Sequence, residues 1–226
     1  TTAPVPVHSG PFSVNEGSSI LLDGTGSTDN LAVQSTAWDI DGDGFDDGDP
    51  STFNGIDGPS THTVSLQVID HAGNDSTSAT TVTVNNVAPS VDAANASVTV
   101  DEGQSTANNG TFTDPGNDIV TITASAGTVS QVGTQNGTWA WSFNAIDGPS
   151  ESQTVTITAT DSDLAATTTT FALTVNNVAP AVTAAGDTIS ENGTATVSGT
   201  IFAPGILDTF TVIIDWGEGV PQRFSY

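Results

Sequence analysis

The residues best suited to chemistry in this chain are acidic, and they are concentrated in one short segment. Residues 38–47 read WDIDGDGFDD, and six acidic residues fall between Asp39 and Asp49. Like charges this close repel one another unless water or a cation takes up their field. Asp39, Asp41 and Asp43 alternate and are followed by glycine, which matches the first half of a D-x-D-x-D-G calcium loop. The segment therefore predicts a site for a hard divalent cation.

The acidic segment does not continue as an EF-hand. An EF-hand loop has a bidentate glutamate at its twelfth position, where this chain has Pro50, and no helical period flanks the segment. We expect Asp46 and Asp47, with Asp49 as a further candidate, to complete the shell around Ca2+ instead. The alternative is a hydrated turn that binds nothing, because aspartate and glycine are ordinary turn residues.

The charge balance of the whole chain excludes several classes of partner. The 226 residues include 26 acidic side chains and a single Lys or Arg, which gives a formal net charge of −25. Binding to nucleic acid or to an anionic membrane surface needs basic side chains, so neither is an expected partner. No apolar run approaches the roughly 18 residues of a membrane-spanning helix. Because cysteine is absent, disulfides and thiol chemistry are excluded as well.

The sequence also repeats itself. FNGIDGPSTHTVSLQVID at 53–70 returns as FNAIDGPSESQTVTITATD at 143–161, and VTVNNVAPSV at 82–91 returns as LTVNNVAPAV at 173–182. Such self-similarity indicates an array of similar modules. We assign three of them: residues 1–87, residues 88–178, and residues 179–226, which amount to about half a module.

Within each unit, apolar and polar residues alternate. Val155, Ile157 and Ala159 alternate with threonine, and Trp139 and Trp141 share one parity. Strict alternation indicates strands with one buried and one exposed face. About seven short strands separated by turn signals in each full unit are typical of an immunoglobulin-like β-sandwich. We expect an all-β chain of tandem immunoglobulin-like sandwiches, the last one incomplete, with the tryptophans in the cores rather than on a sugar-binding face.

Four stretches of the first unit together resemble a PKD (polycystic kidney disease) repeat: VNEGSSILLDGTGSTD, WDIDGDG, TVSLQVIDHAGN and TVTVNNVAP. Members of that family carry a tryptophan followed by an acidic Gly-rich turn, and a closing strand that ends in Asn-Val. IDWGEG at 214–219 fits the same turn, whereas TWAWSFN at 138–144 lacks the acids and is similar to generic bacterial immunoglobulin-like repeats. The resemblance implies PKD-type sandwiches in a stalk or adhesin of a large surface protein of a bacterium or archaeon, and no catalysis.

Chain direction in such a sandwich places a second set of acids at the joints between units. The A–B turn and the turn before strand F lie at the end where the linker leaves, and the B–C and F–G turns of the next unit face them. We expect the following residues around the two joints: Glu16, Asp57, Asn86, Asp114, Asp118, Asp161 and Asp163 at the first, and Glu102, Asp147 and Asn177 at the second. Tandem cadherin domains resemble this layout, although not this sequence. Either Ca2+ bridges the units there and stiffens the hinge, or these residues are simply good turns and a good linker.

We expect no enzymatic activity, because His8, His62 and His71 are scattered and match neither a catalytic triad nor a zinc site. The first hypothesis is a structural segment of an extracellular array, stiffened by calcium, at the cell surface or secreted. Its partners are the neighbouring modules; other copies in a fibre or surface layer, and surface glycans, stay open. The alternative is a ligand- or carbohydrate-binding accessory of a secreted hydrolase. The half unit invites strand addition from another chain, unless its remainder lies beyond this sequence.

Overall fold

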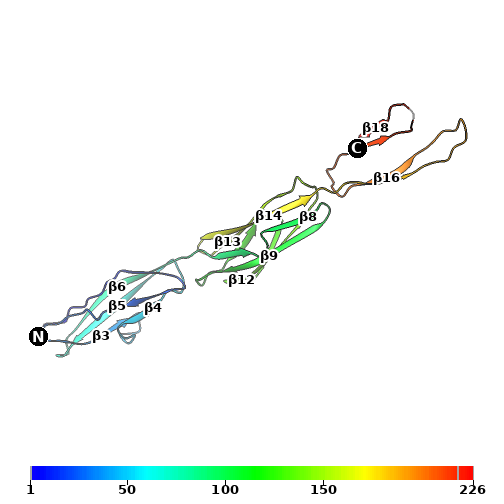
Figure 1. The fold of residues 1–226 in the computed structure, drawn as a ribbon. Coiled ribbons are helices and arrows are strands. Elements are labelled where there is room, and N and C mark those ends of the chain that lie inside the picture. The colour runs from blue at the N-terminus through cyan, green and yellow to red at the C-terminus, as the bar shows by residue number, and fades with distance from the viewer. Residues whose placement is uncertain (1, 218, 226) are drawn as a thin grey trace.

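The computed structural model describes residues 2–217 and 219–225. The modules follow one another in a row, so that the chain is elongated and the N-terminus lies at the end opposite to the third module (Figure 1). Strands are the regular secondary structure of the described residues, and these residues form no helix long and apolar enough to cross a membrane. Glu218 of the predicted turn IDWGEG lies outside the described residues.

The first module is a sandwich of two sheets. One sheet has the strand order β1–β6–β5–β3, with β1 parallel to β6, and the second pairs β2 with β4. The strands are β1 Phe12–Asn15, β2 Ser19–Leu22, β3 Val33–Asp39, β4 Ser51–Asn54, β5 Ser60–Asp70 and β6 Asp75–Asn85. Alternate residues of the long strand β5, Val64, Leu66 and Val68, are fully buried. They pack with Trp38 in one apolar core, as the alternation predicts.

The second module has two four-stranded sheets, with the orders β7–β9–β12–β11 and β8–β14–β13–β10. Its strands are β7 Ser90–Ala93, β8 Ser97–Asp101, β9 Ser105–Thr113, β10 Thr121–Ala124, β11 Thr128–Val132, β12 Asn136–Asn144, β13 Gln153–Thr160 and β14 Ala166–Asn176. In chain order these are strands A, A′, B, C, D, E, F and G of an immunoglobulin sandwich, with A, B, E and D in one sheet and C, F and G in the other. The prediction of an all-β chain of tandem immunoglobulin-like sandwiches is confirmed.

The tryptophans of the first two modules lie in the cores. Trp38 is fully buried, and Trp139 and Trp141 are each 1% exposed, so the prediction that they point inward is confirmed. Trp141 contacts Phe171 edge to face, with ring centroids 4.8 Å apart. Each indole N–H has an acceptor, which for Trp141 is a main-chain carbonyl at 2.6 Å. Trp216 of the third module is 46% exposed, so the expected core position is not found for this tryptophan, whose module has no covering sheet among the described residues.

The third module is the incomplete one. Its strands form two separate antiparallel pairs, β15 Ala181–Ala185 with β16 Ser198–Phe202, and β17 Thr211–Ile214 with β18 Gln222–Ser225. Because no further sheet covers these pairs in the described residues, apolar side chains such as Val182 and Phe202 stay well exposed, at 65% and 68%.

Candidate metal sites at the module joints

Glu16 is the central acid of the first joint. It lies in the turn between β1 and β2 and is only 1% exposed. Its carboxylate accepts hydrogen bonds from the N–H groups of Gly58 (2.8 Å) and Val87 (2.7 Å), and its own N–H donates to the carbonyl of Asn85 (3.0 Å). Glu16 therefore fixes three segments of the first module to one another: the A–B turn, the turn before β5, and the linker.

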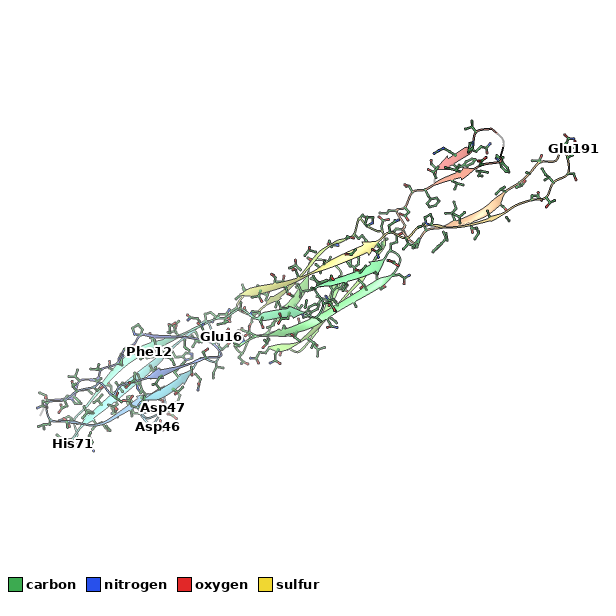
Figure 2. All side chains as sticks on the ribbon, viewed as in Figure 1. Phe12, Glu16, Asp46, Asp47, His71 and Glu191 are labelled. Carbon is green, nitrogen blue, oxygen red and sulfur yellow. The ribbon has the colours of Figure 1, made fainter. Side chains whose placement is uncertain are left out.

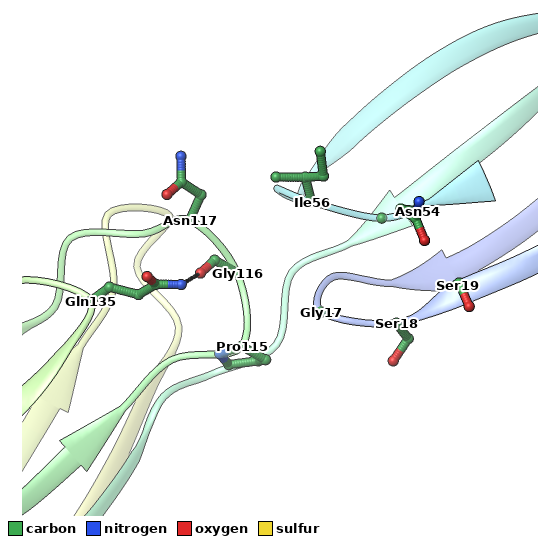
Figure 3. Close-up of a pocket in the computed structure, with 10 residues that line it drawn as sticks. Gly17, Ser18, Ser19, Asn54, Ile56, Pro115, Gly116, Asn117 and Gln135 are labelled. Carbon is green, nitrogen blue, oxygen red and sulfur yellow. Dashed lines mark hydrogen bonds between the residues drawn. The ribbon is translucent and has the colours of Figure 1, made fainter. Parts of the chain in front are cut away.

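The second module approaches Glu16 through the turn after β9. The turns meet so closely that two positions require glycine (Figure 3). A Cβ atom at Gly116 would lie 2.5 Å from the Glu16 carboxyl group, and one at Gly17 would lie 2.7 Å from the carbonyl oxygen of Pro115. Gly17 also has φ +70°, in the left-handed region that favours glycine. The contact between the modules is thus built into the backbone of both turns.

Carboxylates from both modules converge at this contact. Oxygens of Glu16, Asp57 and Asp118 lie within 4.8 Å of one another, and so do oxygens of Asp114, Asp118 and Asp161. Asp118 belongs to both groups. The three acids of the second group are 3–4% exposed, and they come from the B–C and F–G turns of the second module. The predicted arrangement of acids from two modules around one linker is therefore present.

Three buried oxygens at the joint lack a donor. Oδ2 of Asp114, Oδ2 of Asp118 and Oδ1 of Asn86 accept no hydrogen bond from the described residues. The neighbouring atoms are in use, because the Ser162 hydroxyl donates to Asp118 Oδ1 and the Asn86 amide donates to Asp161 Oδ2 at 3.1 Å. Leaving a buried acceptor unsatisfied costs about 1–3 kcal/mol. Carboxylate and amide oxygens are the ligands that Ca2+ takes in proteins.

The charges at the joint are not balanced by basic side chains. Burial raises the pKa of Asp114 to about 6, with smaller contributions from the negative charges of Asp118, Glu16 and Asp161. The chain has one Arg and no Lys, and this residue, Arg223, lies in β18 of the third module. A buried carboxylate is tolerated when it is paired or bound to a metal, so this cluster has the electrostatic character of a cation site.

Two predicted residues lie at the exposed rim of the first joint. Asp57 is exposed and contributes to the group around Glu16. Asp163 is also exposed, and its pKa is raised by loss of hydration and by the charge of Asp118 and a hydrogen bond with it. Asp163 is therefore close to the cluster without being part of either group.

The second joint repeats the backbone arrangement of the first. Glu102 is 1% exposed, and it accepts hydrogen bonds from the N–H groups of Gly148 (2.7 Å) and Val178 (2.8 Å). Its N–H donates to the carbonyl of Asn176 at 3.0 Å. A Cβ atom at Gly205 would lie 2.7 Å from the Glu102 carboxylate, as at the equivalent glycine of the first joint. The two joints are thus built in the same way.

The acids of the second joint include one that sequence analysis missed. Oxygens of Glu102, Asp147 and Asp208 lie within 4.8 Å of one another. The motif APGILD, which matches DPGND of the second module after one inserted residue, is the signal that could have identified Asp208. Asn177 is exposed, and its side chain makes no hydrogen bond with the described residues. Its counterpart Asn86 donates to Asp161 in the F–G turn of the second module, and the described residues of the third module contain no equivalent turn.

The acidic turn of the first module gathers part of its predicted set. Oxygens of Asp39, Asp41 and Asp43 lie within 4.8 Å of one another, on partly or fully exposed side chains. A hydrogen bond with Asp41 and its charge, followed by the charges of Asp46 and Asp47, raise the pKa of Asp43. Asp46 and Asp47 lie at the edge of the module outside this group (Figure 2), so their role as ligands stays a prediction.

Asp49 is hydrogen-bonded to the core of the module through one oxygen, and its Oδ2 is buried without a partner among the described residues. Its Oδ1 accepts hydrogen bonds from the indole N–H of Trp38 (3.1 Å) and from the N–H of Gly24 (2.8 Å). It is therefore turned toward the core, away from the exposed acids that precede it.

The histidines lie apart from one another. His8 lies 3.1 Å from the Ser78 hydroxyl and His62 lies 3.1 Å from the Ser60 hydroxyl. His71 is exposed in the turn between β5 and β6, at the far end of the first module (Figure 2).

No family model matches the chain, and no curated protein matches it. Among solved structures, the chain is similar to titin domains z1z2 in complex with telethonin, with 20% identity, a TM-score of 0.40, and coverage of 78% of this chain and 98% of that one. It is also similar to the insect immune protein hemolin, with 15% identity, a TM-score of 0.42, and coverage of 76% and 47%. A three-domain titin variant gives 11% identity, a TM-score of 0.39, and coverage of 99% and 83%. These likenesses concern the fold.

Proposed function

We propose that this chain is a non-catalytic structural segment of an extracellular repeat array, in which Ca2+ bound at the joints sets the stiffness of the rod. One observation carries the proposal: buried carboxylates of two modules converge at the first joint, and no basic residue is near enough to pair with them. Glu16 comes from the first module, and Asp114, Asp118 and Asp161 come from the second.

The electrostatics make the joint sensitive to the cation. Two carboxylates at the limiting distance of 4.8 Å repel each other by about 3.5 kcal/mol at an effective dielectric constant of about 20. Between Glu16 and Asp118 this repulsion acts across the joint and favours separation of the modules. A divalent cation between the same groups reverses the sign of the interaction, so binding favours one fixed orientation.

Calcium suits the donors better than zinc or copper. The groups offer only oxygen atoms and include both buried and exposed carboxylates, which matches the six to eight oxygen ligands and flexible geometry of Ca2+. Zinc and copper prefer histidine or cysteine, and the joint clusters contain neither.

The proposal includes a location at the surface of a bacterium or archaeon and a PKD-type first module, on the strength of the motifs around WDIDGDG. The partners are the neighbouring modules, with other copies in a fibre or surface layer as further candidates. The alternative of a carbohydrate-binding accessory has less support, because three of the four tryptophans are buried in cores and offer no face for stacking on a sugar: Trp38, Trp139 and Trp141.

The distribution of distances between two spin labels tests the proposal. The chain has no cysteine, so Thr63→Cys and Thr154→Cys, at exposed positions on β5 and β13, allow one label in each module. We expect a narrow distribution in Ca2+ and a broad one in chelator, measured by double electron–electron resonance. Identical distributions in the two conditions would contradict the proposal.

A charge-matched pair of variants controls for nonspecific effects. Asp118→Asn removes a shared ligand and should leave the distribution broad even in Ca2+. Asp75→Asn removes the same charge at the start of β6, ten residues before the end of the strand that lies near the joint. Its distance distributions with and without Ca2+ should match those of the unaltered chain.

A further inference from the structure

We propose that the first joint binds two divalent cations rather than one, an inner and an outer ion bridged by the carboxylate of Asp118. The inference deepens the proposed function and depends on it. It starts from the observation that the acids form two groups of three which have only Asp118 in common.

The inner site belongs mainly to the second module. Its carboxylates are Asp114, Asp118 and Asp161, all at least 96% buried. Two of them have a buried oxygen without a hydrogen-bond partner among the described residues, namely Oδ2 of Asp114 and Oδ2 of Asp118. Asn86 of the linker holds Asp161 by a hydrogen bond and has a buried, unpartnered Oδ1 of its own. These oxygens are suitable ligands for a hard cation, and the linker supplies one of them.

The outer site spans the joint. Glu16 and Asp57 come from the first module and Asp118 from the second. Oxygens around a calcium ion lie about 2.3–2.6 Å from it, so opposite ligands are about 5 Å apart, and separations up to 4.8 Å fit one shell. Each group therefore has the dimensions of a single coordination sphere.

The charge also favours two ions. The two groups together hold five carboxylates, so one divalent cation would leave a net charge of −3 and two would leave −1. Asp118 has the two oxygens that a bridge needs. Its Oδ2 has no donor among the described residues, and its Oδ1 accepts a hydrogen bond from the hydroxyl of Ser162.

The second joint differs from the first at one ligand of the inner group. It repeats the outer group as Glu102, Asp147 and Asp208. Pro204 and Gly205 make the contacts at the second joint that Pro115 and Gly116 make at the first. Ala203, which precedes them, therefore occupies the position of Asp114. An alanine cannot ligate a cation, so the second joint keeps the outer site without this ligand of the inner one.

Manganese titration of the unaltered chain tests the bridge directly and needs no variant. Two Mn2+ ions that share a carboxylate, typically about 3.5–4 Å apart in two-metal sites, are magnetically coupled. Their electron paramagnetic resonance spectrum then shows hyperfine lines at half the spacing of an isolated ion. We expect this coupled signal, and its loss in Asp118→Asn. A spectrum of isolated ions alone, at saturating Mn2+, would overturn the proposal.

Calorimetric counting of Ca2+ separates this inference from the proposed function. The starting protein, called the background below, is the full chain with four substitutions that remove the other candidate calcium sites. These are Glu102→Gln and Asp208→Asn at the second joint, and Asp41→Asn and Asp43→Asn in the acidic turn. We expect two ions in this background, one after Asp57→Asn or Asp161→Asn, and none after Asp118→Asn. The near-ultraviolet circular dichroism of the buried tryptophans verifies that each variant is folded.

The remaining outcomes are distinct. If the four-substitution chain bound one ion and each of the three variants lost it equally, the pair of ions bridged by Asp118 would be overturned. The proposal that calcium stiffens the joint would be unaffected. No ion in the background would overturn both. Asp75→Asn should leave the count at two.

Discussion

Removal of calcium should make Asp114 an unusually weak acid, and this is the sharpest consequence of the proposed joint. Burial, together with the charges of Asp118, Glu16 and Asp161, raises its pKa from 3.8 to about 6. A bound cation requires the ionised carboxylate and should lower that pKa. The perturbation is therefore the exchange of calcium for chelator, and the observable is the titration of one side chain.

The size of the effect follows from the shift. The rise of the pKa from 3.8 to about 6 corresponds to about 3 kcal/mol that favours the protonated side chain in the folded, metal-free protein. Because the pKa is higher in the folded than in the unfolded state, the free energy of unfolding of the metal-free chain should fall as pH rises from about 4 to about 6. Protons compete with Ca2+ for this group, so calcium affinity should weaken as pH falls below about 6.

Carboxyl carbon-13 NMR measures this titration, with Asp114→Asn to assign the signal. We expect a midpoint near pH 6 in chelator and a clearly lower one in saturating Ca2+. Asp70 is a useful internal comparison, because the side chain and main chain of Asn74 lower its pKa within the first module, and calcium should not move it. A midpoint near 3.8 in chelator, or the same midpoint with and without calcium, would refute the reasoning.

Three other changes have direct consequences. Gly116→Ala places a methyl group 2.5 Å from the Glu16 carboxyl group, so we expect weaker calcium binding by calorimetry with little change in the denaturation midpoint of either module. Trp141→Ala should destabilise the second module by about 3–5 kcal/mol, because it removes a large buried side chain, as urea denaturation followed by circular dichroism will measure. Asp41→Asn with Asp43→Asn should remove one calcium ion from the count without broadening the spin-label distribution, since these acids lie in a turn away from the joint.

The joints are the part of the site that the sequence predicts best, because the repeat and the direction of the chain together fix which turns lie there. Glu16 and Glu102 were placed at the joints because strand order assigns each turn of a sandwich to one end. The structure gives each glutamate the same three hydrogen bonds with main-chain groups, two accepted by its carboxylate and one donated by its N–H. Strand alternation likewise predicted that Trp139 and Trp141 point inward, since parity alone decides the buried face.

The failures have physical causes of their own. Asp208 was missed because an inserted residue shifts its turn relative to the second module. Asp118 belongs to both groups because the second module lies close to the first. The amino-acid sequence does not contain the distance between two modules, so this sharing could not be predicted.

The joint is pre-organised, and this determines how much stiffness a cation can give. Glu16 is held by N–H groups of Gly58 and Val87 within its own module, and Asp161 is held by main-chain Ala165 at 2.8 Å within the other. The cation therefore joins two half-sites that are already ordered, so little conformational entropy is lost on binding and more of the interaction appears as affinity. At the second joint, Ala203 replaces an acid. If calcium sets stiffness as proposed, the first joint should be the stiffer of the two at any subsaturating calcium concentration, and the rod should bend first at the second.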